Sequence, residues 1–207
     1  MPGVDRTTVD LQPLKDARVP VIFIIGGPGS GKGTQCALIA QKFGLSHLSS
    51  GELLRKEVKS GSERGKKLQQ MMAAGELVPL EVVLDLLKEA MLRELSGGSK
   101  GFLIDGYPRE ARQGAEFEKE IMECSCVVYL DISEECMTRR LLERAKSSGR
   151  VDDNEETIRK RLATFRTLTL PLISQYKSKL IQVSAEGTVD EIFAEVSPHL
   201  EALLKKA

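Results

Sequence analysis

Short apolar runs recur along the chain and predict the strands of a buried sheet. Residues 19–25 form a continuous apolar and β-branched run, and shorter runs of the same kind cover 101–104 and 126–130. A fourth candidate covers 179–183, and a short one lies around 46–48. Continuous apolar runs of this length are typical of strands that are buried on both faces.

Longer segments with helical spacing separate these runs. Pro79 suits a first helical turn, and the apolar positions that follow it at helical spacing are Leu80, Val83, Leu84, Leu87 and Met91. A second series of this kind is Ile158, Leu162, Phe165 and Thr169. Asp153, with Glu156 three residues later, is expected to cap that helix. Strands that alternate with helices predict an α/β fold, a parallel sheet covered by helices on both faces.

The chain departs from plain alternation in two intervals. Residues 49–78 hold two short polar helices where one is expected, and residues 146–153 form a polar, hinge-like loop between two helices. Both intervals are candidates for moving parts of one domain rather than separate domains. We expect residues 1–18, which are polar and mixed, to be a loose extension, and residues 19–207 to form a single domain.

Composition and charge exclude several classes of protein. The 207 residues are 41% hydrophobic and 29% charged, as expected of a globular chain. Lys+Arg and Asp+Glu both total 30, which argues against a nucleic-acid binder or a binder of anionic membranes. No apolar run approaches the roughly 20 residues that span a bilayer, and the N-terminus resembles neither a secretory signal nor a transit peptide. We therefore expect a cytoplasmic protein.

The cysteines and histidines give no sign of a metal centre. The four cysteines lie in or beside apolar stretches, where free buried thiols are common. No C-x2-C pair is present, so the spacing does not favour a zinc site. His47 and His199 are isolated, and we expect His47 to be structural or partly exposed.

The residues that follow the first strand carry the strongest chemical signal. Residues 26–34 read Gly-Gly-Pro-Gly-Ser-Gly-Lys-Gly-Thr, which contains the pattern G-x-x-x-x-G-K between a strand and a helix. Glycines allow backbone N–H groups to surround phosphate oxygens, and the helix N-terminus and Lys32 add positive charge. Gly33 stands where a metal-binding hydroxyl is usual, and Thr34 follows it. We therefore expect a phosphate-binding loop whose metal is held mostly through water.

The base-reading motifs of GTP-switch proteins are absent. The only asparagine is Asn154, which Glu155 follows, so no N-K-x-D motif exists, and no D-x-x-G motif is present either. A switch GTPase is therefore excluded.

The phosphate loop and three further segments together resemble a known family of enzymes. In order and spacing, the chain resembles the adenylate kinases, most closely the short-lid cytosolic kind, over 26–35, 50–55, 101–109 and 149–153 together with Arg161. The resemblance implies a three-layer phosphate-loop nucleoside monophosphate kinase fold with a five-stranded parallel sheet. It also implies a monophosphate-binding segment at 49–78 and a short lid at 143–153. The implied reaction is reversible transfer of a phosphoryl group from ATP to AMP, giving two ADP, with Mg²⁺ and in a monomer.

The resemblance also assigns roles to residues. It implies that ATP is bound by Gly29, Ser30, Gly31, Lys32, Gly33, Thr34, Arg144 and Gly187. It implies that AMP is held by Ser50, Arg55, Glu76, Leu77, Val78, Gly106, Tyr107, Pro108, Arg109, Gln113, Arg150 and Arg161. The implied catalytic residues are Lys32, Arg140, Arg150 and Arg161. Asp105, at the end of a strand, would orient Mg²⁺ through its waters.

The distribution of arginine supports this assignment independently. Seven of the 14 arginines fall between residues 139 and 166 in a chain without net charge. Arg140 and Arg144 are four residues apart and so share a helix face. Guanidinium groups bind phosphates bidentately, and two nucleotides that meet head to head bring several negative charges together. We expect Arg139, Arg159 and Arg166 to form ordinary ion pairs on a solvated face instead.

Two other functions remain open at this stage. UMP/CMP kinases are related enzymes, and Ser50 and Glu52 stand where adenylate kinases commonly have Thr and Asp. Gln113 favours adenine, because its amide can pair with a purine edge. A non-catalytic nucleotide-binding protein with this fold would usually lack Lys32, Asp105 or a lid arginine, and all of them are present.

Overall fold

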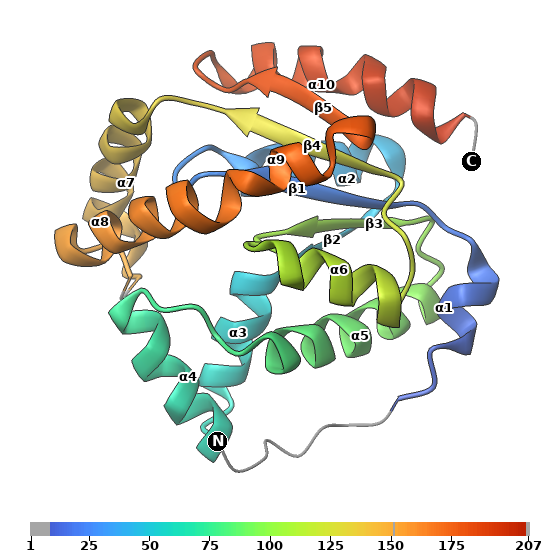
Figure 1. The fold of residues 1–207 in the computed structure, drawn as a ribbon, viewed down its shortest axis with the longest axis horizontal. Helices are drawn as coiled ribbons and strands as arrows, with labels where there is room; N and C mark the ends of the chain where they lie inside the picture. Colours follow the sequence, from blue (N-terminus) through green and yellow to red (C-terminus); the bar gives the residue numbers. More distant parts are fainter. Residues whose placement is uncertain (1–8, 151, 206–207) are drawn as a thin grey trace.

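A computed structural model describes residues 9–150 and 152–205 of the chain, and its centre is a five-stranded parallel sheet. The strands are β1 (Val21–Gly26), β2 (Ser46–Ser49), β3 (Phe102–Asp105), β4 (Cys126–Asp131) and β5 (Leu180–Ser184). They are arranged in the order β2-β3-β1-β4-β5 (Figure 1). All five predicted strands are present, and the predicted parallel sheet is confirmed.

The register brings the carboxyl ends of three strands to the same edge of the sheet. Asp105 of β3 lies opposite Ile24 of β1 on one side and Ser49 of β2 on the other. The chain leaves β1 toward β2 on one side of the sheet and reaches β4 on the other. Ligands of open α/β sheets bind outside the carboxyl ends of the strands at such a switch point.

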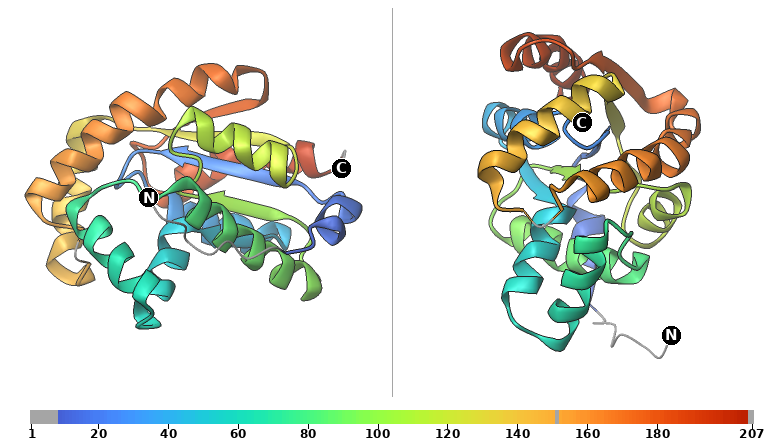
Figure 2. Two further views of the ribbon diagram at one scale, coloured as in Figure 1. Left: turned by 60° about the horizontal axis from the view of Figure 1, so that its bottom comes forward. Right: turned by 90° about the vertical axis from the view of Figure 1, so that its left-hand side faces the viewer.

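Helices cover both faces of the sheet (Figure 2). On one face, α2 (Lys32–Phe43) packs on the first three strands and against α10 (Val189–Leu204). The other face is covered by α5 (Leu80–Ser96), α6 (Ala111–Glu120) and α9 (Pro171–Gln175). Thr188 and Glu191 form a capping box that fixes the start of α10. The predicted three-layer architecture is confirmed.

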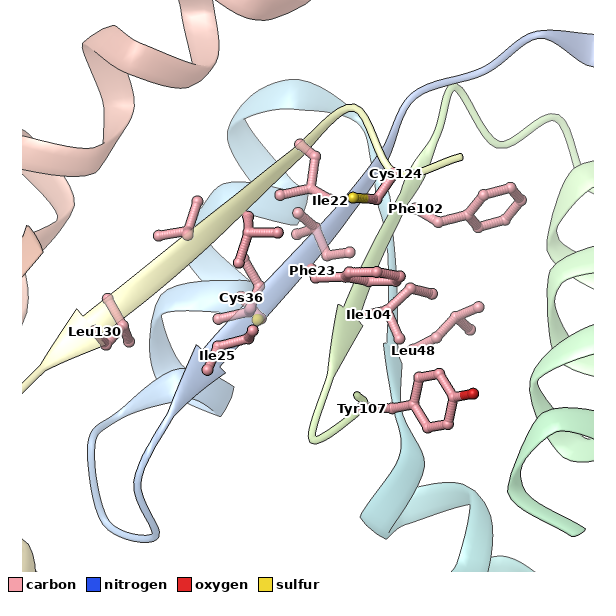
Figure 3. Packing of buried hydrophobic residues seen from close by; sticks show 14 of the residues in the cluster. Ile22, Phe23, Ile25, Cys36, Leu48, Phe102, Ile104, Tyr107, Cys124 and Leu130 are labelled. Carbon is pink, nitrogen blue, oxygen red and sulfur yellow. The ribbon is translucent and has the colours of Figure 1, made fainter. Parts of the chain in front are cut away.

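The core is built on the central strands (Figure 3). The ring of Phe23 in β1 meets Phe117 edge to face at a centroid distance of 5.1 Å and Tyr176 at 5.9 Å. Burial of rings of this size stabilises the layer between β1 and the helices α6 and α9. The four cysteines are free and buried, as expected from their apolar surroundings.

The two irregular intervals are paired helices that border the carboxyl edge of the sheet. The first consists of α3 (Ser50–Lys59) and α4 (Glu63–Ala74), which pack against each other. The second consists of α7 (Glu134–Ser148) and α8 (Glu155–Thr164) with the short connection between them. The Thr157 hydroxyl of α8 donates to the Ala73 carbonyl at 3.0 Å, so the two pairs touch. Val151, inside the expected lid 143–153, lies outside the described residues.

The structure differs from the sequence-based expectations in two places, the N-terminal segment and the start of α8. Within the expected loose extension, Gln12–Ala17 form α1, whose Leu14 is fully buried and which packs on α5; residues 1–8 lie outside the described residues. Leu14 anchors this segment, and the half-buried Leu11 also packs against the core. The cap of α8 is Asn154, whose side chain accepts from the Thr157 N–H, because Asp153 is engaged by arginines.

Two further features complete the description. The helix α8 continues into a π-helical turn over Phe165–Thr169, which contacts β1. No helix among the described residues is both long and apolar enough to cross a membrane.

Candidate active site

A pocket of about 560 Å³ opens at the carboxyl edge of the sheet, between the phosphate loop, α3 and α4, and the connection of α7 to α8. Every residue to which the sequence assigned a role lines this pocket except Ser30 and Gly187. Ser30 is fully buried and its hydroxyl contacts the Lys32 ammonium, while the Gly187 carbonyl accepts from Arg140 at 3.3 Å. The structure therefore brings together residues from four distant segments.

The phosphate loop presents an open backbone surface to the pocket. Gly29 and Gly31 have φ angles of 82° and 88°, a region that favours glycine. A Cβ on Gly29 would lie 2.8 Å from the Met137 carbonyl, whereas a Cβ on Gly31 or Gly33 would meet nothing within 4 Å. The loop is thus held against α7 on one side and is free on the side where a phosphate would bind.

Lys32 lies in the loop that it serves. Its ammonium donates to the carbonyls of Gly26 and Gly27, both at 2.8 Å. The pKa of Lys32 is lowered to about 8, chiefly by burial. Asp105 opposes this shift, and the nearby guanidinium groups of Arg109 and Arg161 add to it. A bound phosphate would supply the negative charge that the ammonium lacks in this arrangement.

Asp105 is the carboxylate at the floor of the pocket. It ends β3 and is 7% exposed. Burial alone would raise the pKa of Asp105, but His47, Lys32 and Arg109 together hold it below its usual value. Nε2 of His47, in β2, lies 3.5 Å from Asp105 Oδ2. No local pattern in the sequence places His47 beside this carboxylate, because the contact depends on the pairing of β2 with β3.

The segment after β3 forms a rigid wall on the side assigned to AMP. The Ser50 hydroxyl donates to the Gly106 carbonyl at 2.8 Å, and the same carbonyl accepts from Nε of Arg109 at 2.8 Å. The Arg109 N–H donates to Gln113 Oε1 at 2.8 Å, and its carbonyl accepts from Thr169 at 2.8 Å. Arg109 is therefore fixed at both ends. Its pKa is lowered by burial.

Glu52 links two arginines that the sequence assigned to substrates. It forms an ion pair with Arg55 on its own helix and with Arg150 of the lid, where the shortest distance is 3.3 Å. Glu52 is exposed, and the pKa of its carboxyl is lowered chiefly by the hydrogen bond from Arg55. One carboxylate thus takes the place that a phosphate would need between two guanidinium groups.

Two aspartates hold the lid arginines. Asp153 is buried and accepts a bidentate pair from Arg144, at 2.9 and 2.5 Å, and a hydrogen bond from Ser148 at 2.7 Å. Arg161 pairs with Asp152 at 2.7 Å and approaches Asp153 at 3.4 Å. Sequence reasoning missed this role for both aspartates. Their position inside the arginine-rich interval was the available signal.

Most of the remaining arginines of the interval lie where they were expected. Arg140 and Arg144 share the face of α7 that lines the pocket. Arg159 pairs with Glu155 at 3.8 Å and Arg166 with Glu134 at 3.5 Å, both at exposed positions, and neither lines the pocket. Arg139 is also exposed and does not line the pocket, but its guanidinium donates to Cys136 Sγ at 3.1 Å where an ion pair was expected.

An apolar wall completes the pocket on the side of α3 and α4. It includes Leu77 and Val78, whose part was expected, and three residues to which the sequence assigned no role in the site, Leu54, Met72 and Val83. Apolar side chains of this kind suit the faces of a planar base. Leu54, Met72 and Val83 are single positions on three different helices. They form no local motif, so they could not be identified as pocket residues from the sequence.

Comparisons with known proteins agree with this geometry. A family model described as "Adenylate kinase" matches residues 24–181. Adenylate kinase isoenzyme 1 of Caenorhabditis elegans is 58% identical over 207 residues, covering 99% of this chain and 99% of that protein. Adenylate kinase 1 of Schistosoma mansoni is 60% identical over 189 residues, covering 90% and 95%. Adenylate kinase isoenzyme 1 of Homo sapiens is 56% identical over 188 residues, covering 90% and 96%.

Proposed function

This chain belongs to the adenylate kinase family, and from that premise we propose how its pocket carries out the reversible reaction of ATP and AMP to give two ADP. The observation that carries the proposal is the convergence of Lys32, on the phosphate loop, with arginines of the lid in one pocket. The phosphate loop holds ATP, and the wall formed by Ser50 and Arg109 holds AMP.

The ATP side combines backbone and charge. The free surface at Gly31 and Gly33 and the N-terminus of α2 offer N–H groups to phosphate oxygens. Lys32 exchanges its contacts with two loop carbonyls for contacts with phosphate. Arg144 extends this side from α7, and Arg140 ties α7 to the Gly187 carbonyl.

The AMP side is built from the opposite wall. Arg109 grips the AMP phosphate because its backbone is fixed at both ends, which positions its guanidinium group in advance. Arg55 and Arg150 join it once Glu52 releases them. Gln113 and the apolar wall near Val78 recognise the base, and the amide of Gln113 favours adenine.

Transfer is in line and requires no general base, since the AMP phosphate is already a nucleophile at neutral pH. Phosphoryl transfer passes through a loose transition state, so alignment and charge stabilisation supply most of the catalysis. Lys32, Arg140, Arg150 and Arg161 surround the migrating group. Closure of the lid excludes water, the competing acceptor.

The residues present fit a magnesium ion held through water. Asp105 offers a carboxylate at the pocket floor, and its lowered pKa keeps it ionised at neutral pH. Gly33 provides no hydroxyl beside the loop lysine, so a direct ligand from that position is lacking. Mg²⁺ prefers oxygen ligands and retains several waters, and when bound with ATP it neutralises phosphate charge. Asp105 would orient those waters.

Phosphorus NMR of the protein mixed with ADP and Mg²⁺ tests the reaction directly. ATP and AMP should appear together in equal amounts, and a protein that only binds nucleotide would produce neither. Initial rates with AMP, UMP and CMP as acceptors then test the assignment of the base site. AMP should be preferred, and a preference for UMP or CMP would overturn the role given to Gln113.

The setting of the protein is part of the same proposal. We place it in the cytoplasm as a monomer that uses Mg²⁺, with ATP, AMP and ADP as its substrates. The balanced charge of the chain supports the absence of a nucleic-acid partner.

A further inference from the structure

Three side chains with different metal-ligand atoms meet beneath the pocket. They are Cys36 of α2, His47 of β2 and Asp105 of β3, and one ligand atom from each lies within 4.8 Å of the others. The distance from His47 Nε2 to Asp105 Oδ2 is 3.5 Å. Because the three residues come from separate elements, no spacing in the sequence could reveal this set.

The histidine of this set has an unused ligand atom. Nε2 of His47 is buried and lies 3.5 Å from Asp105 Oδ2, but it makes no hydrogen bond of acceptable geometry within the described residues. Buried polar atoms without a hydrogen bond are rare, and a bound cation is one of the groups that can satisfy a buried imidazole nitrogen. Its neighbour Cys36 is fully buried on the face of α2 toward the sheet, next to Ile25 at the end of β1 (Figure 3).

We propose that Cys36, His47 and Asp105 form a binding site for a zinc-class divalent cation, and that its occupation inhibits the enzyme. Sulfur, imidazole nitrogen and carboxylate oxygen are the ligand types of zinc, whereas Mg²⁺ prefers oxygen alone. The fourth position faces the pocket, because both His47 and Asp105 line it. A water or a nucleotide phosphate completes the coordination there.

The geometry requires only a small contraction. Zinc bonds to sulfur, nitrogen and oxygen are about 2.0–2.3 Å long, which places tetrahedral ligand atoms about 3.3–3.8 Å apart. The ligand atoms, now within 4.8 Å of one another, would have to approach by at most about 1.5 Å on this estimate. His47 is only half-buried, so its ring has room to adjust.

The charge balance favours a dication in spite of the nearby ammonium of Lys32. On binding, the S–H bond of Cys36 breaks, a sulfur–metal bond forms and the proton leaves to solvent. The thiolate and the Asp105 carboxylate together neutralise the ion, and no oxidation or reduction takes place.

Inhibition follows because the ion occupies Asp105. This consequence rests on the proposed role of Asp105 toward the waters of Mg²⁺, whereas metal binding itself does not. The two can therefore be measured separately, with nucleotide absent in one experiment and present in the other.

Binding is tested on the full chain without nucleotide. Titration with Co²⁺ should produce a thiolate-to-cobalt charge-transfer band, and calorimetry with Zn²⁺ should give one equivalent per chain. Cys36→Ala should abolish the band and weaken Zn²⁺ binding at least about tenfold. Loss of a residue that only hydrogen-bonds to a metal ligand already lowers metal affinity about 10- to 100-fold. Cys126→Ala, which removes another buried cysteine, is the matched control and should bind as the unsubstituted chain does.

A second variant keeps the test decisive if Cys36→Ala fails to fold. His47→Gln should also weaken Zn²⁺ binding at least about tenfold. Unchanged binding in either folded variant, a band that persists without Cys36, or the absence of any Zn²⁺ binding would overturn the site.

Activity is measured over a series of buffered free Zn²⁺ concentrations, with Mg²⁺ in excess. Cys36→Ala should need at least about tenfold more Zn²⁺ for half inhibition than the unsubstituted chain, in proportion to its weaker binding. Binding without inhibition would leave the metal site in place and overturn the role given to Asp105. Equal inhibition of both proteins would overturn the link between this site and activity.

Discussion

The ammonium of Lys32 is the charge on which the chemistry most depends. It is buried at the base of the phosphate loop, where water contributes little competing stabilisation. We expect Lys32→Met to lower kcat by about 10²- to 10³-fold, the usual loss when one preorganised donor to the transition state is removed. Steady-state kinetics measure this, with thermal unfolding as a check of the fold. A kcat within about tenfold of the original would argue against the assigned role.

The same ammonium should leave a mark on the pH dependence of stability. The pKa of Lys32 is lowered from 10.5 to about 8 in the folded, ligand-free chain by burial. At this group the unfolded state binds more protons than the folded state between these values, so Lys32 by itself contributes a rise in the free energy of unfolding with pH. Buried thiols and phenols with raised pKa values, such as Cys126, contribute a fall over the same interval. Urea unfolding of the two proteins should therefore show that the free energy of the original chain minus that of Lys32→Met increases with pH across the interval. Parallel curves would mean that the ammonium is not desolvated.

Arg109 offers a test of the AMP side at the level of one guanidinium group. Hydrogen bonds to charged groups contribute about 1.5–3 kcal/mol, so Arg109→Ala should raise KM for AMP about 10- to 100-fold with a smaller effect on KM for ATP. Arg159→Ala is the matched control, because Arg159 is exposed, pairs only within α8 and does not line the pocket. An unchanged KM for AMP would remove Arg109 from the AMP site.

Among the elements, those defined by local pattern were predictable and those defined by long-range contact were not. The continuous apolar run of β1 and the helical series after Pro79 each indicate their secondary structure within a few residues. The order of the strands depends on pairing between distant segments, which no local pattern encodes. The helix α1 was not predicted for the same reason, because its position depends on the burial of Leu14 and on contacts with the distant helix α5.

The site divides in the same way. The phosphate loop was predictable because its chemistry requires glycines and a lysine at fixed spacing. The roles of Ser50 and Gln113 came only from the resemblance to a family. Asp153 satisfied the local pattern of a helix cap, but two arginines compete for its carboxylate, and Asn154 caps α8 instead.

The contact of α3 with the lid makes a prediction at the scale of elements. Glu52 holds Arg55 and Arg150, so its neutralisation should free both for phosphate. Exposed ion pairs contribute about 0.2–1 kcal/mol, and we therefore expect Glu52→Gln to lower KM for AMP about two- to fivefold at low salt. Glu63→Gln, which removes an exposed partner of Lys66 on α4, is the control. A higher KM for AMP in Glu52→Gln would show that this carboxylate assists binding.

At the scale of the whole molecule, a fixed sheet carries two appendages on its carboxyl edge. The central strands and their covering helices are closely packed around Phe23. The pairs α3–α4 and α7–α8 meet each other mainly through polar contacts, such as those of Glu52 with Arg150 and Thr157 with Ala73. Polar contacts of this kind are weak and can be exchanged for ligand contacts. We therefore expect the two appendages to close over the pocket without a change in the core.

Closure should be visible as a change in amide hydrogen exchange that is confined to the appendages. A dinucleotide that joins two adenosines through a chain of phosphates would occupy both sides of the pocket and pair with Lys32 and the lid arginines. Its binding should slow exchange in residues 49–78, 146–150 and 152–154, because opening of these segments then requires the loss of charge-assisted hydrogen bonds. The strands β1 and β4 serve as an internal control, since they are already buried without ligand. Equal exchange of the appendages with and without the dinucleotide would mean that the pocket works without closing, and the exclusion of water would then need another explanation.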